Sequence, residues 1–263
     1  MLQPSFQIKD VSRFEALKLR GRILSSSDKT LLKQLEFSLA PDLMLYWQVY
    51  HAAEETLQQG NQFGIHLPDS LTKAALSRRC DYLIGRYCAQ QAIAKLCGFP
   101  QQVQQQNNGA PVWPGGLIGS ITHSDGLALA IVGKHAHWDW LGIDVEALVS
   151  KDESLSMMPV IMNEEEHKII TAAINAQDYA FTLVFSAKKS IYKALYPKVR
   201  SFFDFHDVSL LACDGNKQLL QFSLSHSLAQ KVSARLINVN YQLIGKQVVT
   251  WSLRQQPKLR QKQ

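Results

Sequence analysis

The chain has 263 residues, 46% of them hydrophobic, so it can bury a core in one large or two small domains. It contains no apolar run of about 18 residues, and we therefore expect no membrane-spanning helix. The first six residues lack a charged head and an apolar core, so we expect no secretion signal.

A formal net charge of +6 favours an acidic or phosphorylated partner. A nucleic acid is disfavoured in that role, because aromatic residues do not cluster among the basic ones. The four cysteines have no CxxC spacing, which argues against a zinc site and for a reducing compartment. We therefore expect a cytoplasmic protein, and we expect it to be a monomer.

Residues 1–65 carry no pattern typical of a catalytic or binding site. We predict that they form an N-terminal extension that packs on the main body. Within it, residues 43–50 could form a helix or a strand, and residues 60–64 have the glycines of a loop.

A long helix is predicted from Ser70 to about Cys97, where apolar residues recur with helical spacing and Gly98 follows as a candidate C-cap. Its other face carries Arg78, Arg79 and Arg86. Three arginines on a helix fit either a solvated face or a phosphate-binding one.

Two short apolar runs, Leu117–Ser124 and Leu127–Val132, are separated by an Asp-Gly pair, which is a strong hairpin signal. This hairpin places Thr122 and His123 at the end of a strand, beside a tight turn. A histidine there either makes a structural hydrogen bond or contacts a ligand.

Residues 140–146 alternate between apolar and acidic positions, the pattern of a half-buried strand. Asp144 and Glu146 therefore share one face, with their Cα atoms roughly 6.5–7 Å apart. Two carboxylates this close repel unless a cation lies between them or they share a proton. Mg²⁺ prefers oxygen ligands of this kind, so the pair fits either a solvated strand end or a metal site.

The second half begins with the polar residues 150–154, which we interpret as a linker and a domain boundary. Asn163 is a candidate N-cap for a helix that reaches Ile174. A longer helix is predicted from Asp178 to Tyr196, where Pro197 would stop it. This helix carries Lys188, Lys189 and Lys193, and the remainder is predicted as strands over residues 205–212, 219–225, 234–239 and 248–253.

Each half thus has helical material followed by about three short strands. We predict an α+β fold with two pseudo-symmetric subdomains, each a helix plus a small antiparallel sheet, and an active site in the cleft between them. The first half spans residues 66–149 and holds the acidic pair, and the second spans residues 150–253 and holds the lysine helix. Residues 254–263 form a basic tail that we expect to be disordered.

Four short stretches occur in a fixed order along the chain. They are Tyr82-Leu83-Ile84-Gly85-Arg86; Trp113-Pro114 followed by Gly119-Ser120-Ile121-Thr122-His123; Gly142-Ile143-Asp144-Val145-Glu146; and Phe185-Ser186-Ala187-Lys188-Lys189-Ser190-Ile191-Tyr192-Lys193. In this order and spacing the chain resembles the 4'-phosphopantetheinyl transferase superfamily, in particular the branch of enterobactin synthetase component D. The resemblance runs from about residue 65 to residue 253.

The resemblance implies transfer of phosphopantetheine from coenzyme A to a serine of an acyl or peptidyl carrier protein, with release of 3',5'-ADP. It implies that Asp144 and Glu146 hold Mg²⁺, which neutralises charge on the pyrophosphate oxygens. It also implies two catalytic lysines, Lys188 and Lys193, that approach the pyrophosphate. The residues implied to contact coenzyme A are Arg78, Arg86, Thr122, His123, Lys188 and Lys193.

One position departs from the family pattern, because Lys189 stands where the family has a metal-binding glutamate. A protonated lysine cannot coordinate Mg²⁺. The two remaining carboxylates could suffice, Lys189 could replace the ion, or the chain could be a paralogue that binds coenzyme A or a carrier protein and catalyses weakly or not at all. The sequence does not name the carrier, and siderophore, polyketide and fatty acid synthesis all stay open.

Overall fold

The structure is a computed structural model that describes residues 26, 29–30, 32–33, 40 and 42–257. Its helices are α2 (Glu54–Gln62), α3 (Leu76–Cys97), α4 (Lys151–Ile161), α5 (Glu164–Ala173), α6 (Ala180–Val199) and α7 (His226–Val232). Its strands are β1 (Leu43–Val49), β2 (Gln104–Gln105), β3 (Pro111–Val112), β4 (Leu117–Ser124), β5 (Leu127–Lys134), β6 (Trp138–Ala147), β7 (Val208–Asp214), β8 (Leu219–Leu224), β9 (Leu236–Ile244) and β10 (Gln247–Gln255).

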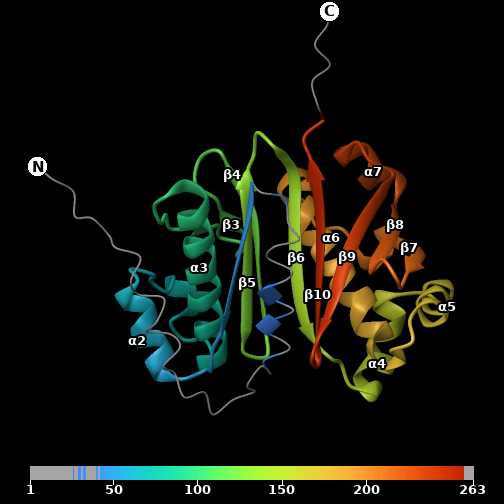
Figure 1. Ribbon diagram of the computed structural model, residues 1–263, viewed down its shortest axis with the longest axis horizontal. Coiled ribbons are helices and arrows are strands. Elements are labelled where there is room, and N and C mark those ends of the chain that lie inside the picture. The colour runs from blue at the N-terminus through green and yellow to red at the C-terminus, as the bar shows by residue number, and fades with distance from the viewer. Residues whose placement is uncertain (1–25, 27–28, 31, 34–39, 41, 258–263) are drawn as a thin grey trace, which may run out of the picture.

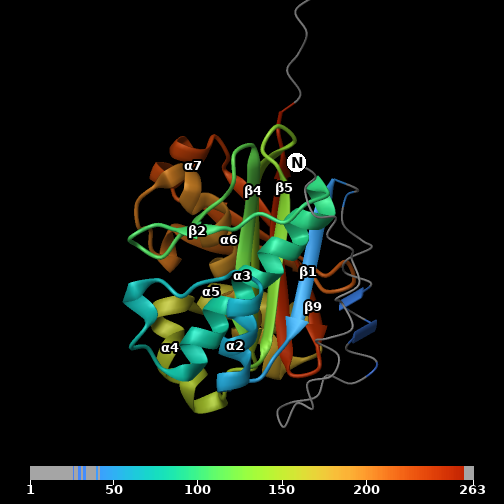
Figure 2. The same ribbon diagram turned by 90° about the vertical axis from the view of Figure 1, so that its left-hand side faces the viewer.

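Two antiparallel sheets organise the molecule (Figure 1). One has the order β1-β5-β4, and α3 packs on it, as Figure 2 shows from the side. The other has the order β6-β10-β9-β8-β7, and α6 packs on β6 and β10. The strands β2 and β3 form a separate small ribbon. This arrangement confirms the predicted α+β fold.

The central strand β5 shows why the first sheet is covered on both faces. Ala128, Ala130 and Val132 point to the helix α3 and pack with its buried side chains. The alternate residues Leu129 and Ile131 point to the opposite face, where they pack with apolar residues of β1, β6 and β10. A strand that is buried on both faces has an almost continuous run of apolar residues, and β5 has such a run.

The strand β6 belongs to the second sheet, although the sequence analysis assigned its residues to the first half. It pairs antiparallel with β10, with Asp144 opposite Thr250. A strand can pair with one from a distant part of the chain, and hydrophobic alternation does not specify that partner. The acidic pair therefore lies on the five-stranded sheet, next to β10, the last strand among the described residues.

Side-chain hydroxyl groups join the two sheets where β4 meets β6. Three hydroxyls on one face of β4 each accept a hydrogen bond at 3.1 Å from a backbone N–H of β6, and we call this contact the hydroxyl seam. Its pairs are Ser120 with Ile143, Thr122 with Val145, and Ser124 with Ala147. Because buried backbone N–H groups need a partner, the seam fixes how β4 is aligned with β6.

Several predicted boundaries differ from the structure. Residues 43–49, open between helix and strand, form β1, which pairs with β5. The predicted linker at residues 150–154 instead begins α4, because Ser150 and Glu153 form a capping box. The long helix begins at Ala180, and it continues past Pro197 to Val199 because a proline in the last turn removes only one hydrogen bond.

The predictions for the chain termini fall partly outside the described residues. Residues 1–25 and 258–263 lie there, so the predicted extension and the predicted disordered tail are untested at those positions. Arg254 and Gln255, which the sequence analysis assigned to the tail, are the last residues of β10.

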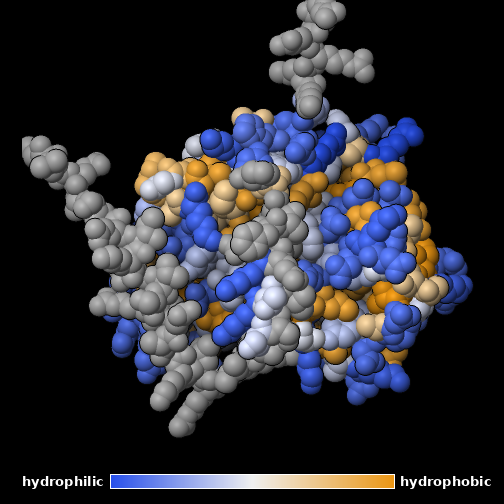
Figure 3. All heavy atoms as spheres, viewed as in Figure 1, coloured by the Kyte–Doolittle hydropathy of each residue, from blue (hydrophilic) through white to orange (hydrophobic). Residues whose placement is uncertain are grey.

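One face of the described part of the molecule is mixed in polarity. In Figure 3 hydrophobic residues lie in several patches that hydrophilic residues separate. Within the part of the chain that the structure describes, no helix is both long enough and apolar enough to span a membrane.

Candidate active site

The strand β6 turns its acidic residues toward α6. Leu141, Ile143 and Val145 lie in the apolar core on one face of the strand. Asp144 and Glu146 lie on the other face, because successive side chains of a strand alternate. Asp144 is completely buried, and the Glu146 side chain is 18% exposed.

Two lysines of α6 meet these carboxylates. The Lys193 Nζ atom lies 2.6 Å from Asp144 Oδ1, and the Lys189 Nζ atom lies 3.6 Å from the same oxygen. Lys189 also donates a hydrogen bond to Glu146 Oε1. We call these four residues the lysine-acid cluster. It holds two negative and two positive groups, all within the reach of one small ligand.

Hydroxyl groups complete the surroundings of Asp144. Ser186 donates to Asp144 Oδ2 at 3.0 Å, and its oxygen lies 3.0 Å from the hydroxyl oxygen of Thr250. Thr122 donates to Asp144 Oδ1 at 3.3 Å while it accepts from the Val145 N–H in the hydroxyl seam. A buried carboxylate is stable only when it is paired and hydrogen-bonded, and these donors meet that condition.

The charged groups of the cluster shift one another's pKa values. Burial raises the pKa of Glu146, and the nearby Asp144 raises it further, while Lys189 opposes both effects. Burial alone would lower the pKa of Lys189, but the two carboxylates outweigh it and raise that pKa. Burial lowers the pKa of Lys193, which Asp144 only partly offsets.

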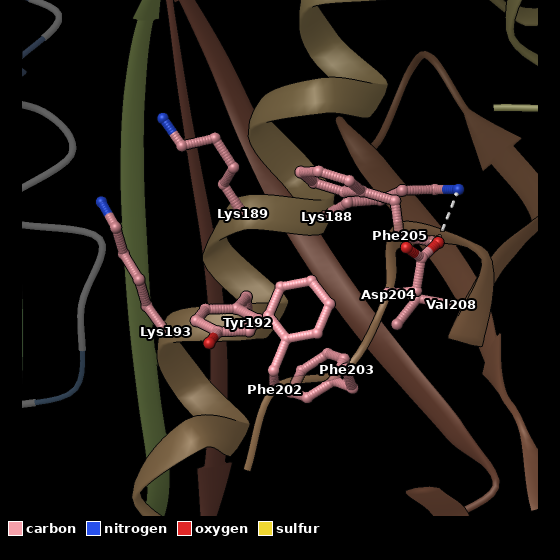
Figure 4. Close-up of a pocket in the computed structure, with 9 residues that line it drawn as sticks. All are labelled: Lys188, Lys189, Tyr192, Lys193, Phe202, Phe203, Asp204, Phe205 and Val208. Atoms are coloured by element: carbon pink, nitrogen blue, oxygen red, sulfur yellow. Dashed lines mark hydrogen bonds between the residues drawn. The ribbon is translucent and has the colours of Figure 1, made fainter. Parts of the chain in front are cut away.

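The structure does not bring Lys188 to this cluster. Its Nζ atom lies 2.8 Å from Glu166 Oε1 and donates to the backbone carbonyls of Ile161 at 2.7 Å and Phe205 at 3.1 Å. Figure 4 shows its ammonium group on the side of the helix away from those of Lys189 and Lys193. Burial lowers the pKa of Lys188, although Glu166 opposes this. As placed, Lys188 ties α6 to α5.

His123 and Arg78 lie together beside the cluster. The Arg78 Nη1 atom lies 3.2 Å from His123 Nε2, and His123 Nδ1 lies 3.4 Å from Asp81 Oδ2. Tyr50 donates to the other oxygen of Asp81. Burial lowers the pKa of His123 to about 4, helped by the positive charges of Lys193 and Arg78 and opposed by Asp81. The imidazole is therefore neutral at physiological pH.

Arg86 lies in a separate cavity of about 190 Å³ whose lining includes Tyr82 and Gln102. Its side chain is buried, and its guanidinium carbon lies 4.9 Å from the centre of the Tyr82 ring. Among the described residues, Arg86 Nε has no hydrogen-bond partner. Burial lowers the pKa of this guanidinium group. A buried donor without a partner suits an anionic or polar ligand.

An aromatic groove of about 300 Å³ opens beside the lysine-acid cluster (Figure 4). We define it by its lining residues Lys188, Lys189, Tyr192, Lys193, Phe202, Phe203, Asp204, Phe205 and Val208. The rings of Tyr192 and Phe203 lie 4.8 Å apart and form its wall. The groove is thus mainly apolar, and Figure 4 shows the ammonium groups of Lys189 and Lys193 pointing away from its rings. This arrangement suits a ligand whose apolar arm lies in the groove and whose anionic group reaches past the helix to the cluster.

Comparison with known proteins identifies the family. The 4'-phosphopantetheinyl transferase N-terminal domain matches residues 67–133, and the 4'-phosphopantetheinyl transferase superfamily matches residues 141–249. Between them these ranges cover most of the chain. The chain belongs to the 4'-phosphopantetheinyl transferase superfamily. The resemblance drawn from the four sequence stretches is thereby confirmed.

Individual relatives agree with this assignment. "Enterobactin synthase component D" of Salmonella typhimurium is 34% identical over 131 residues, which are 50% of this chain and 54% of that protein. The protein of the same name from Salmonella typhi is 29% identical over 183 residues, 69% of this chain and 74% of its own length. "4'-phosphopantetheinyl transferase Npt" of Nocardia iowensis is 31% identical over 144 residues, 53% of this chain and 62% of that protein. The chain thus spans about half the length of the first of these relatives.

The lysine-acid cluster of this superfamily member does not fit Mg²⁺ as it is arranged. Within the described part of the chain, no three His, Cys, Asp or Glu side chains are grouped to hold a metal ion. The Lys189 ammonium group instead contacts both carboxylates that would be ligands. A dication ~4 Å from an ammonium group would be repelled by about 8 kcal/mol at an effective dielectric near 20, before screening. A divalent ion would therefore have to displace Lys189.

Sequence reasoning missed three residues that support the site: Asp81, Ser186 and Glu166. Ser186 had a detectable signal, because Ser186, Lys189 and Lys193 are spaced i, i+3, i+7 and so share one helix face. Lys188 is one position away from Lys189 and therefore points in another direction. Asp81 and Glu166 contact their partners through the tertiary fold, and spacing along the chain gives no signal for them.

Proposed function

We propose that this chain transfers the 4'-phosphopantetheine group from coenzyme A to a serine of an apo carrier protein, giving the holo carrier protein and 3',5'-ADP. The observation that carries the proposal is the convergence of Lys189 and Lys193 on Asp144 and Glu146, beside the aromatic groove that the two lysine side chains also line. The family assignment supports the same reaction.

The substrate has the chemistry that this geometry suits. Coenzyme A carries a pyrophosphate between a nucleotide and a long, weakly polar pantetheine arm. The ammonium groups of Lys189 and Lys193 would bind the pyrophosphate oxygens, and the ring wall of Tyr192 and Phe203 would hold the arm. Arg78, beside the neutral His123, would contact the 3'-phosphate, which is the one phosphate of coenzyme A outside the pyrophosphate. The buried Arg86 would contact a polar group of the nucleotide from its separate cavity.

In the proposed reaction, the carrier serine hydroxyl attacks the β-phosphorus of the pyrophosphate. A phosphorus–oxygen bond to the serine forms, the bond to the 3',5'-ADP leaving group breaks, and the hydroxyl proton is released. Negative charge on the transferring group is spread over its oxygens during this step. Preorganised ammonium donors such as Lys193 stabilise such charge without rearranging during the reaction.

The direct test is transfer by the purified chain. Coenzyme A is incubated with an apo peptidyl carrier protein or an apo acyl carrier protein, and the carrier is followed by intact mass spectrometry. We expect the mass increase of one phosphopantetheine group, with a carrier whose acceptor serine is changed to alanine as the control. Relatives named enterobactin synthase component D support testing a siderophore carrier first.

Calorimetry separates this function from that of a binding protein. Tight binding of coenzyme A without transfer to any tested carrier would contradict the proposal and favour a catalytically weak or inactive paralogue. Transfer to the acyl carrier protein of fatty acid synthesis, but not to the siderophore carrier, would support the proposed reaction. It would assign the chain to fatty acid synthesis instead of siderophore synthesis.

A further inference from the structure

The position of Lys189 is the feature that the family resemblance does not explain. Its Nζ atom lies 3.6 Å from Asp144 and donates a hydrogen bond to Glu146, so it contacts both acids of the strand β6. Two carboxylates on one strand face repel each other unless a cation lies near them or they share a proton. In this chain a side chain of α6 supplies that cation.

The lysine-acid cluster is balanced in charge without any ion. Asp144 is paired with Lys193 at 2.6 Å, and Glu146 is paired with Lys189. An Mg²⁺ ion prefers carboxylate oxygens among near-octahedral ligands, and α6 offers no carboxylate, because residues 180–199 contain no aspartate or glutamate. A divalent ion in this place would lie beside two ammonium groups.

Lys189 is also held in place from its other side. Its Nζ atom lies 5.2 Å from the centre of the Phe185 ring, one helical turn earlier in α6. Its side chain is 32% exposed, so a ligand bound at the cluster can reach it while it contacts the acids. Lys189 can therefore balance the acids and face a bound anion together.

We propose that Lys189 takes the place of a divalent metal ion in this site, where it balances Asp144 and Glu146 and, with Lys193, faces the pyrophosphate of the bound substrate. The inference that the site binds no divalent ion rests on the cluster alone. The role toward the pyrophosphate rests on the proposed function. The chain is thus a transferase whose reaction does not require Mg²⁺.

The first experiment measures metal binding without any reaction. Mn²⁺, a probe for Mg²⁺ sites, is titrated into the full chain and free Mn²⁺ is followed by electron paramagnetic resonance. We expect no saturable Mn²⁺ binding by the wild type, and saturable binding by Lys189→Glu at Mn²⁺ concentrations at least about tenfold below the highest one tested on the wild type. Lys189→Gln, which removes the cation without adding an acid, should lie between them. Lys168→Glu changes the net charge equally on an exposed part of α5 and should match the wild type.

Thermal unfolding gives a second readout and checks that the variants fold. Mn²⁺ should raise the Tm of Lys189→Glu, because a ligand that binds only the folded state stabilises it, and should leave that of the wild type unchanged. The inference is overturned if Mn²⁺ binds the wild type at a saturable site that Asp144→Asn abolishes.

The second experiment measures transfer to the carrier in EDTA and in Mg²⁺. The wild-type rate should agree within about twofold between the two, whereas Lys189→Glu should lose about tenfold in EDTA and regain it with Mg²⁺. A wild-type rate that EDTA abolishes and Mg²⁺ restores would overturn the inference. If no variant transfers under either condition, the proposed function fails, and the order of Mn²⁺ affinities decides the metal question by itself.

Discussion

Gly142 and Ser190 approach each other so closely that a Cβ atom built on Gly142 would lie 2.0 Å from the Ser190 carbonyl oxygen. This contact lets α6 lie directly on β6. The lysines of the helix can therefore reach Asp144 and Glu146, which follow Gly142 on the same face of the strand. A residue without a side chain is thus a condition for the lysine-acid cluster.

The substitution Gly142→Ala tests this contact. The added methyl group meets backbone, which cannot rotate away, so we expect a loss of about 1–3 kcal/mol in the free energy of unfolding. The transfer rate should also fall by about tenfold or more, because the lysines and acids move apart. Urea unfolding and rate measurements check both effects. Gly115→Ala, where nothing lies within 4 Å of the new Cβ, should change stability by less than about 0.5 kcal/mol.

The substitution Lys188→Met tests whether this lysine is structural. It leaves Glu166, which is 2% exposed, without its ion-pair partner, so we expect a loss of about 3–5 kcal/mol in the free energy of unfolding. The same change at Lys168, whose pair with Glu165 is exposed to solvent, should leave the free energy of unfolding almost unchanged. The affinity of folded Lys188→Met for coenzyme A should match that of the wild type. Unchanged stability with lost affinity would instead support the role first predicted from the sequence.

The buried His123 predicts a loss of stability in acid. Its pKa falls from 6.5 in the unfolded chain to about 4 in the fold, so between these values the unfolded state binds more protons. Stability should therefore fall as the pH drops from 6.5 to about 4, by at most about 3 kcal/mol from this group. His123→Gln should show a flatter dependence of Tm on pH over this window. Parallel curves for the two proteins would contradict the prediction, and an NMR titration of the imidazole measures its pKa directly.

The hydroxyl seam predicts a difference between two substitutions at Thr122. Thr122→Val leaves the buried Val145 N–H without an acceptor and removes a donor to Asp144, so it should cost about 1–3 kcal/mol. Thr122→Ser keeps the hydroxyl and should cost less. Equal unfolding midpoints in urea for the two variants would show that the seam contributes little.

The aromatic groove predicts a selective effect on binding. Phe202 is 78% exposed at the groove, and its ring centre lies 6.2 Å from that of Tyr192. Phe202→Ala should weaken coenzyme A binding by about fivefold, the loss of roughly 1 kcal/mol of apolar contact with the pantetheine arm. Binding of 3',5'-ADP, which lacks that arm, should not change in calorimetry. Phe99→Ala, at another exposed ring, is the matched control.

The sequence by itself determined the local features of this protein. Alternation in residues 140–146 placed Asp144 and Glu146 on one face, because a strand has a period of two. Asn163 was identified as a helix cap, and its side chain accepts a hydrogen bond from the Glu166 N–H at 2.9 Å. Four short stretches in a fixed order identified the superfamily, and the family comparison confirms it.

Only the tertiary structure decided which groups meet. It paired β6 with β10, turned Lys188 toward Glu166, and placed Lys189 against the two acids. Spacing along a chain fixes the direction of a side chain relative to its own helix or strand, whereas its partners depend on how distant elements pack. Asp144 and Lys193 are far apart in the sequence, and their 2.6 Å contact exists because α6 packs on the sheet that contains β6.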